Sequence, residues 1–86
     1  ALVPSPRLLV GRIVAVDRAR GFAFVELADE APADAHKEGT ELIVRTLALA
    51  ETGRIRASRN LRGRTLGATI LRGQPAPGEE VVWLAP

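Results

Sequence analysis

The chain has 86 residues, the length of one small domain. Hydrophobic residues make up 47% and charged residues 26% of it, a globular balance that excludes an intrinsically disordered chain. The formal net charge is only +2, no cysteine is present to form disulfides or thiolate metal sites, and no apolar run approaches the roughly 20 residues of a transmembrane helix.

The first predicted elements form a hairpin. Residues 1–7 contain two prolines and predict an extended leader or tether ahead of a single domain at 8–86. Leu8–Asp17 is rich in β-branched residues, which favours a strand. The segment Arg18–Gly21 predicts a tight turn, and Phe22–Leu27 predicts a second strand that pairs back on the first.

The middle of the chain predicts a loop and one strand. Ala28–Gly39 is acidic and lacks an apolar stripe, so we expect a solvated loop with room for one helical turn. Glu41–Leu47 alternates between apolar and polar residues, which predicts a half-buried strand. A helix over Leu42–Glu51 is the competing interpretation, because alanine and leucine dominate its second half.

The last third predicts three more strands. Alternation favours strands over Gly53–Arg59 and Thr65–Leu71, with a turn at Asn60–Gly63 between them. A loop rich in glycine and proline at Gly73–Gly78 then precedes a final strand over Glu80–Leu84.

Short strands at this spacing predict an all-β fold, a five- to six-stranded antiparallel barrel of the Src-homology-like or OB-like type. A flat open sheet would leave long unpaired edges. The apolar positions of the strands predict a core that contains Ile13, Val25, Val44, Ile55, Ala68 and Ile70.

The sequence offers little for catalysis. His36 is the only histidine, and it lies in the acidic loop beside Asp34 and Glu38, fewer rigid ligands than a zinc site needs. Ser5 and Ser58 have no placed base, and the glycines do not form a phosphate-binding loop before a helix. We therefore expect no enzymatic activity, no catalytic or metal residues and no cofactor.

The basic residues are unevenly distributed. The stretch from Gly53 to Gly73 contains six arginines and no acid, whereas Glu26 to Glu41 contains six acids and one lysine. The favoured interpretation is solvated arginines that prevent strands from pairing edge to edge, and the alternative is a face that binds anions or a partner. The residues of this candidate face are Arg54, Arg56, Arg59, Arg62 and Arg64.

One motif is typical of nucleic-acid binding. The segment Arg20–Leu27 resembles the ribonucleoprotein octapeptide, in which Phe22 and Phe24 project from one strand face and stack on unpaired bases, with Arg20 beside them. Together with the preceding strand, it resembles a cold-shock domain. That family's aromatic pair on the first strand falls here on Ala15 and Val16, so most of the stacking platform is missing.

A second resemblance spans residues 10–82. The segments that carry the resemblance are Val10–Val16, Phe22–Glu26, Gly39–Leu42, Gly53–Ile55, Ala68–Gly73 and Pro77–Val81. This pattern resembles small uncharacterised bacterial β-barrel proteins and, more distantly, the C-terminal barrel of the flagellar assembly protein T family. The resemblance implies a barrel but no site residues. It also implies an exported location, periplasmic or lipoprotein-anchored, with a cytoplasmic location as the alternative.

These observations predict a non-catalytic interaction or structural module whose partner is a protein or a component of the bacterial envelope. The alternative is a cold-shock-like barrel that binds single-stranded nucleic acid through Phe22 and Phe24.

Overall fold

The structure, a computed structural model, describes residues 7–29 and 31–84, with the side chains of Arg7 and Leu84 excepted. The predicted leader therefore lies outside the described residues, apart from Arg7, which begins the first strand. The elements are β1 (Arg7–Asp17), β2 (Phe22–Leu27), the short 3₁₀ helix η1 (Ala33–His36), β3 (Glu41–Arg45), β4 (Glu51–Arg62), β5 (Thr65–Gly73) and β6 (Glu80–Leu84).

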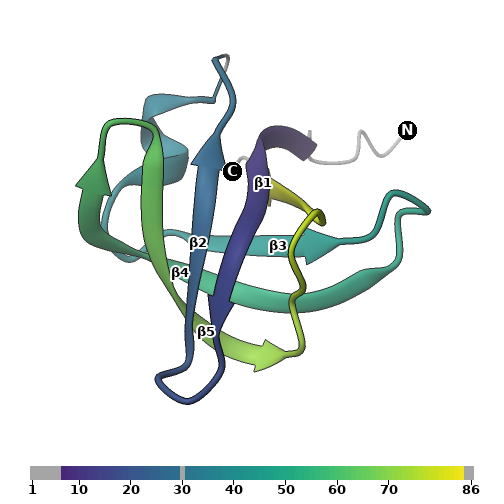
Figure 1. Cartoon of the computed structure of the whole chain (residues 1–86). Helices are drawn as coiled ribbons and strands as arrows, with labels where there is room; N and C mark the ends of the chain where they lie inside the picture. Colours follow the sequence, from purple (N-terminus) through teal and green to yellow (C-terminus); the bar gives the residue numbers. More distant parts are fainter. Residues whose placement is uncertain (1–6, 30, 85–86) are drawn as a thin grey trace, which may run out of the picture.

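The strands form a closed antiparallel barrel in the order β1-β2-β5-β4-β3-β6 (Figure 1). The barrel closes because β1 pairs with β2 along one side and with β6 along the other. Both ladders of β1 contain a register shift, one between Leu9 and Gly11 and one between Ile13 and Ala15. Such bulges bend a strand, as a barrel of this size requires. The prediction of an all-β, five- to six-stranded antiparallel barrel is confirmed, and the number of strands is six.

The core lies inside the barrel and follows the alternation of the strands. In β2, Ala23 and Val25 point inward and are fully buried, whereas Phe24 and Glu26 point outward. Ile70 differs from the prediction, because it is half-buried and packs against the edge of the core. Aliphatic side chains fill the interior, among them Val10, Ile13, Val25, Leu42, Val44, Ile55, Leu66, Ala68 and Val81.

The segment with competing interpretations is a strand followed by a turn. Leu42–Val44 lies in β3 and is buried, and the chain then reverses over Thr46–Ala50, so the helix is wrong there. The acidic loop contains η1, whose Ala35 is fully buried in the core. This loop therefore has an apolar anchor that its sequence did not indicate.

Two adjacent glutamates hold the segment that leads into β6. The Glu79 Oε1 atom accepts hydrogen bonds from the Ala76 amide at 2.7 Å and from the Thr52 hydroxyl at 2.9 Å. The Glu80 carboxylate accepts two hydrogen bonds from Arg45, at 3.1 and 3.2 Å, across the β3–β6 pair. Both carboxylates therefore stabilise the closure of the barrel.

Within the described ranges, η1 is the only helix and no helix is long and apolar enough to cross a membrane.

Candidate functional site

The two phenylalanines of β2 lie on the outside of the barrel. The side chain of Phe24 is 39% exposed, and that of Phe22 is half-buried. Across the two ladders of β2, the neighbours of Phe24 are Ala15 in β1 and Gly67 in β5. Because glycine has no side chain and alanine only a methyl group, both flanks of the Phe24 ring are open.

Two hollows adjoin the Phe24 ring. The larger has a volume of about 360 Å³ and the smaller about 200 Å³. Both are lined by Phe24, Asn60 and Gly67. The larger also contains Arg62 and Thr65, and the smaller also contains Asp17, Arg20 and Phe22. The structure thus joins the predicted stacking residues to Arg62, which the sequence assigned to a separate arginine face.

Asn60 reaches these hollows because β4 is irregular. The register of the β4–β5 ladder shifts between Ala57 and Leu61. At this bulge, the Ser58 hydroxyl donates a hydrogen bond to the Gly67 carbonyl at 2.6 Å and accepts one from the Asn60 amide at 3.1 Å. The sequence prediction placed Asn60 in a turn and missed it as a lining residue.

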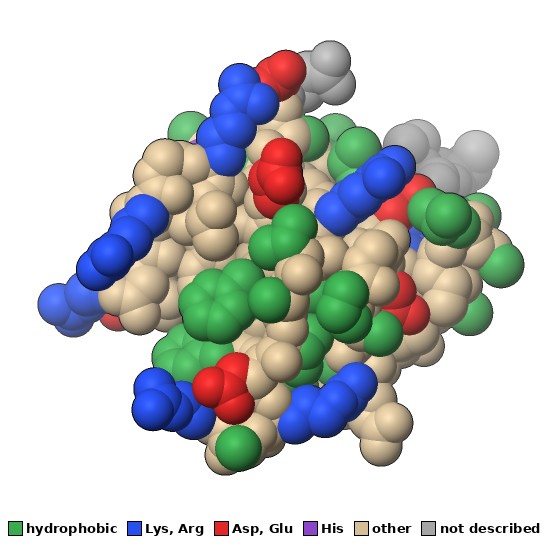
Figure 2. Space-filling model, in the orientation of Figure 1, with side chains coloured by type: hydrophobic (Ala, Val, Ile, Leu, Met, Phe, Trp, Pro, Cys, Tyr) green, Lys and Arg blue, Asp and Glu red, His purple; other side chains and the backbone are tan. Residues whose placement is uncertain are grey.

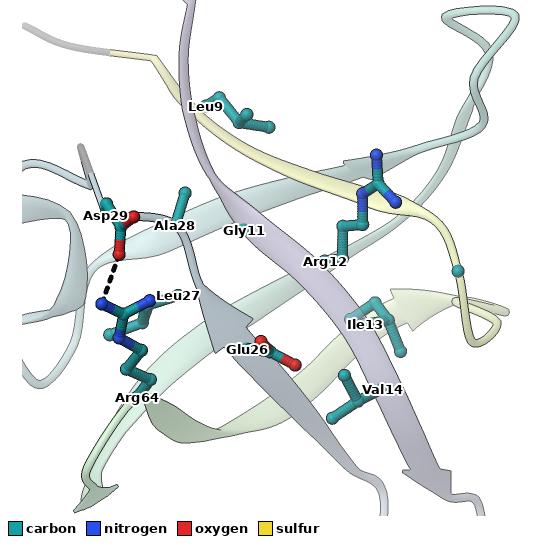
Figure 3. Close-up of a pocket in the computed structure, with 11 residues that line it drawn as sticks. Leu9, Gly11, Arg12, Ile13, Val14, Glu26, Leu27, Ala28, Asp29 and Arg64 are labelled. Carbon is teal, nitrogen blue, oxygen red and sulfur yellow. Dashed lines mark ion pairs between the residues drawn. The ribbon is translucent and has the colours of Figure 1, made fainter.

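A third hollow lies on the outside of β1 and β2. Its volume is about 490 Å³, and Gly11, Leu27 and Ala28 contribute to its lining (Figure 3). Leu9 and Val14, on either side of Gly11 along β1, are 47% and 46% exposed. At the rim, Asp29 and Arg64 form an ion pair, and Arg12 points away from that pair on the other side of β1. The lining of the hollow therefore combines apolar side chains with charges of both signs.

These features belong to one continuous surface, the β1–β2 face. Figure 2 shows hydrophobic side chains grouped on this side of the molecule, with acidic and basic side chains around them. The hydrophobic side chains of this face are exposed or half-exposed, because they project from the outside of the barrel strands. The face consists of Leu9, Arg12, Val14, Asp17, Arg20, Phe22, Phe24 and Glu26.

Most arginines of the candidate anion face are paired with acids. Arg54 contacts Glu51 at 3.6 Å, and Arg59 contacts Glu38 at 3.2 Å. Arg64 pairs with Asp29, and outside the candidate set Arg72 also contacts Glu51, at 3.3 Å. In the described part of the chain, Arg56 and Arg62 form no ion pair. The acidic loop thus neutralises part of the arginine-rich segment, which lowers the charge available to a polyanion.

The residues around His36 do not converge on a metal. Asp34 pairs with Lys37 at 2.8 Å, and the hydrogen bond and charge of that ammonium lower the pKa of the Asp34 carboxyl. Glu38 is held by Arg59 instead. Among the described residues, no three histidine, cysteine or acidic side chains are grouped closely enough to hold a metal ion.

Comparison with known proteins finds no match, since no protein-family model, no curated protein and no solved structure matches this chain.

Proposed function

We propose that the chain is a non-catalytic interaction module that binds a partner protein through the β1–β2 face. The observation that carries this proposal is the exposure of Leu9, Val14 and Phe24 on the paired strands β1 and β2, on the outside of a barrel whose interior is already filled. Exposed apolar side chains that are grouped, rather than scattered, are typical of interaction sites.

The charges of this face favour a protein over a polyanion. Arg12 and Arg20 are balanced by Asp17 and Glu26, with Arg20 and Asp17 at 3.8 Å. Aromatic and aliphatic anchors surrounded by both signs of charge are the usual composition of a protein–protein interface. An exported or lipoprotein-anchored location, which the sequence resemblance implies, would place the partner in the cell envelope.

Site-specific photocrosslinking in cells tests this proposal. A photoreactive amino acid at Val14 should yield an adduct with one partner protein, whereas the same group at exposed Glu41, on β3, should not. The partner, once purified, should bind the Leu9→Ser/Val14→Ser variant at least about tenfold more weakly, since each buried aliphatic side chain contributes about 1.5–3 kcal/mol. Equal adducts from both positions, or unchanged affinity, would contradict the proposal.

A second candidate is the binding of single-stranded nucleic acid. The observation that favours it is the Phe24 ring between two hollows, with Arg20 beside one and Arg62 beside the other. A base stacked on an aromatic ring contributes about 1–3 kcal/mol. Ala15 stands where a further ring would extend the platform across β1, so one well-exposed ring provides affinity for only one base.

We therefore expect weak binding that falls steeply with salt, because the arginines would supply most of it through counterion release. Fluorescence anisotropy with labelled oligo-dT and oligo-rU at two salt concentrations measures this, with Phe24→Ala as the test variant. Sub-micromolar binding at physiological salt that Phe24→Ala abolishes, while the fold stays intact by circular dichroism, would favour this second candidate over the first.

A further inference from the structure

The β3–β4 hairpin ends in an apolar tip that consists of Leu47, Ala48, Leu49 and Ala50. All four residues are exposed. Leu47 is 70% and Leu49 63% exposed, the two largest values among the exposed large hydrophobic side chains of the described residues. The hairpin projects from the barrel at the upper right of Figure 1, away from the β4–β5 hairpin.

The tip is held in one shape by hydrogen bonds within the turn. The Leu49 amide donates to the Thr46 carbonyl at 2.9 Å, and the Thr46 amide donates to the Ala50 carbonyl at 2.9 Å. The Thr46 hydroxyl accepts from the Ala50 amide at 3.2 Å. The amides of Thr46, Leu49 and Ala50 are thus satisfied without water, which reduces the cost of moving this part of the turn into an apolar medium.

Leu49 has a backbone conformation that its side chain disfavours. Its φ angle is 69°, and it is the only residue other than glycine with positive φ in the described part of the chain. In hairpin loops of this kind, the left-handed position usually holds glycine, because a Cβ atom there is strained. A strained, exposed leucine contributes neither to the stability nor to the solubility of this chain. Its position therefore indicates a role in contact with something other than the rest of the chain.

The charged residues begin only at the base of the tip. Arg45 pairs with Glu80 at 3.1 Å. Glu51 pairs with Arg54 at 3.6 Å and with Arg72 at 3.3 Å. Three arginines and two glutamates, a net charge of +1, thus form a collar below four apolar residues.

The tip is too small and too convex for a stable protein interface. Two leucines and two alanines present only a fraction of the about 800 Å² that such an interface buries on each partner. A bilayer needs no complementary shape and accepts any apolar side chain. We propose that the tip inserts into the surface of a lipid bilayer, with Leu47 and Leu49 among the outer acyl carbons and the collar at the headgroups.

This insertion is weak and reversible. The two leucine side chains contain fewer carbon atoms than one myristoyl chain, which binds a membrane with an association constant of about 10⁴ M⁻¹. We therefore expect a lower constant for the tip, so that binding becomes measurable only at about millimolar lipid. Because the collar has a small positive charge, anionic lipid should increase the binding modestly.

Flotation with vesicles of phosphatidylcholine, with and without phosphatidylglycerol, tests the proposal on the whole chain. The wild type should float with the vesicles at millimolar lipid, and Leu47→Ser and Leu49→Gly should lose most of this binding. Leu49→Gly is the sharper variant, because glycine suits φ 69° and the variant should be at least as stable as the wild type in chemical denaturation. Leu61→Ser, which removes another exposed leucine from the β4–β5 hairpin, should bind like the wild type.

A direct measurement of depth uses Leu47→Trp in a Trp83→Phe background. Brominated acyl chains should quench its fluorescence, and its emission should shift to shorter wavelength in the presence of vesicles. Absence of wild-type flotation at millimolar lipid overturns the proposal. The tip would then bind in a pocket of a partner protein. Vesicle binding by Leu49→Gly that equals that of the wild type also overturns the proposal. So does a loss of vesicle binding in Leu61→Ser as large as that in Leu47→Ser.

Discussion

Gly11 is where the barrel wall bends. Its neighbour across the ladder is Leu27, and a Cβ atom at Gly11 would overlap the backbone carbonyl oxygen of Glu26. The strand approaches β2 so closely here that only hydrogen fits. Gly11 also lines the hollow on the outside of β1 and β2, where the absence of a side chain leaves space between Leu9 and Val14.

We expect Gly11→Ala to destabilise the chain by at least about 1–3 kcal/mol, because backbone must move to admit the methyl group. Urea denaturation measures the loss. Gly67→Ala is the matched control, since its new Cβ would meet Asn60 Cβ at 3.3 Å and Ser58 Oγ at 3.4 Å, a tight but tolerable fit. Equal stability of Gly11→Ala and the wild type would contradict the close approach of β1 to β2.

A second prediction for single residues concerns the burial of two isoleucine side chains. Ile55 is fully buried, so Ile55→Ala should cost about 2–5 kcal/mol. Ile70 is half-buried, and Ile70→Ala should cost about half as much, because fewer contacts are lost. Chemical denaturation of both variants checks the difference, and equal losses would place Ile70 in the core.

At the scale of elements, the strands that follow a glycine-containing turn are the ones that the sequence predicts best. The bounds of β2, Phe22–Leu27, match the prediction, because Gly21 ends the turn before it, and in the structure every second residue of this strand is buried. β4 was predicted to end at Arg59 but continues to Arg62, since the polar residues Ser58 and Asn60 suggest a turn and instead form a bulge.

The site was less predictable than the strands. Alternation places Phe22 and Phe24 on the same strand face as Glu26, but the sequence left open whether that face was the core or the outside of the barrel. The place of Asn60 beside them, and the pairing of Arg59 and Arg64 with the acidic loop, depend on contacts between distant segments. The residues next to Asn60, Arg59 and Arg64 in the sequence do not indicate such contacts. The positive φ of Leu49 is also invisible in sequence, because leucine rarely adopts it.

The turn before β6 provides a prediction at this scale. The Glu79 carboxylate accepts hydrogen bonds from Thr52 and Ala76, so Glu79→Ala should cost about 1.5–3 kcal/mol, the usual contribution of a bond to a charged group. Thermal unfolding and urea denaturation measure it. Thr52→Val removes one of the two bonds and should cost less, and a larger loss for Thr52→Val would assign the stability to the hydroxyl instead.

At the scale of the whole molecule, closure joins the first strand to the last. β1 pairs with β6, so the barrel cannot close until nearly the whole described chain is in place. Folds dominated by such distant contacts fold in milliseconds to seconds. Trp83 lies in β6 and packs against the core, which makes it a reporter of the closing step.

Stopped-flow refolding followed by Trp83 fluorescence should therefore show one phase on the scale of about milliseconds to seconds. Ile13→Val, within β1, should change the rate constant of folding or of unfolding measured as a function of urea concentration. Leu61→Ser, at an exposed position of β4, should change neither rate constant by much. Refolding within microseconds would mean that β6 docks before the barrel is complete.

The closed order of the strands also limits how anything can bind this barrel. In the part of the chain that the structure describes, each of the six strands has a neighbour on both sides, so this part offers no free sheet edge onto which a partner could add a strand of its own. Backbone hydrogen bonds are then unavailable as a general source of affinity, and recognition depends on side chains. An inhibitor of this protein would accordingly have to mimic the shape and charges of a surface, because an extended peptide designed to complete a sheet would find nothing to complete.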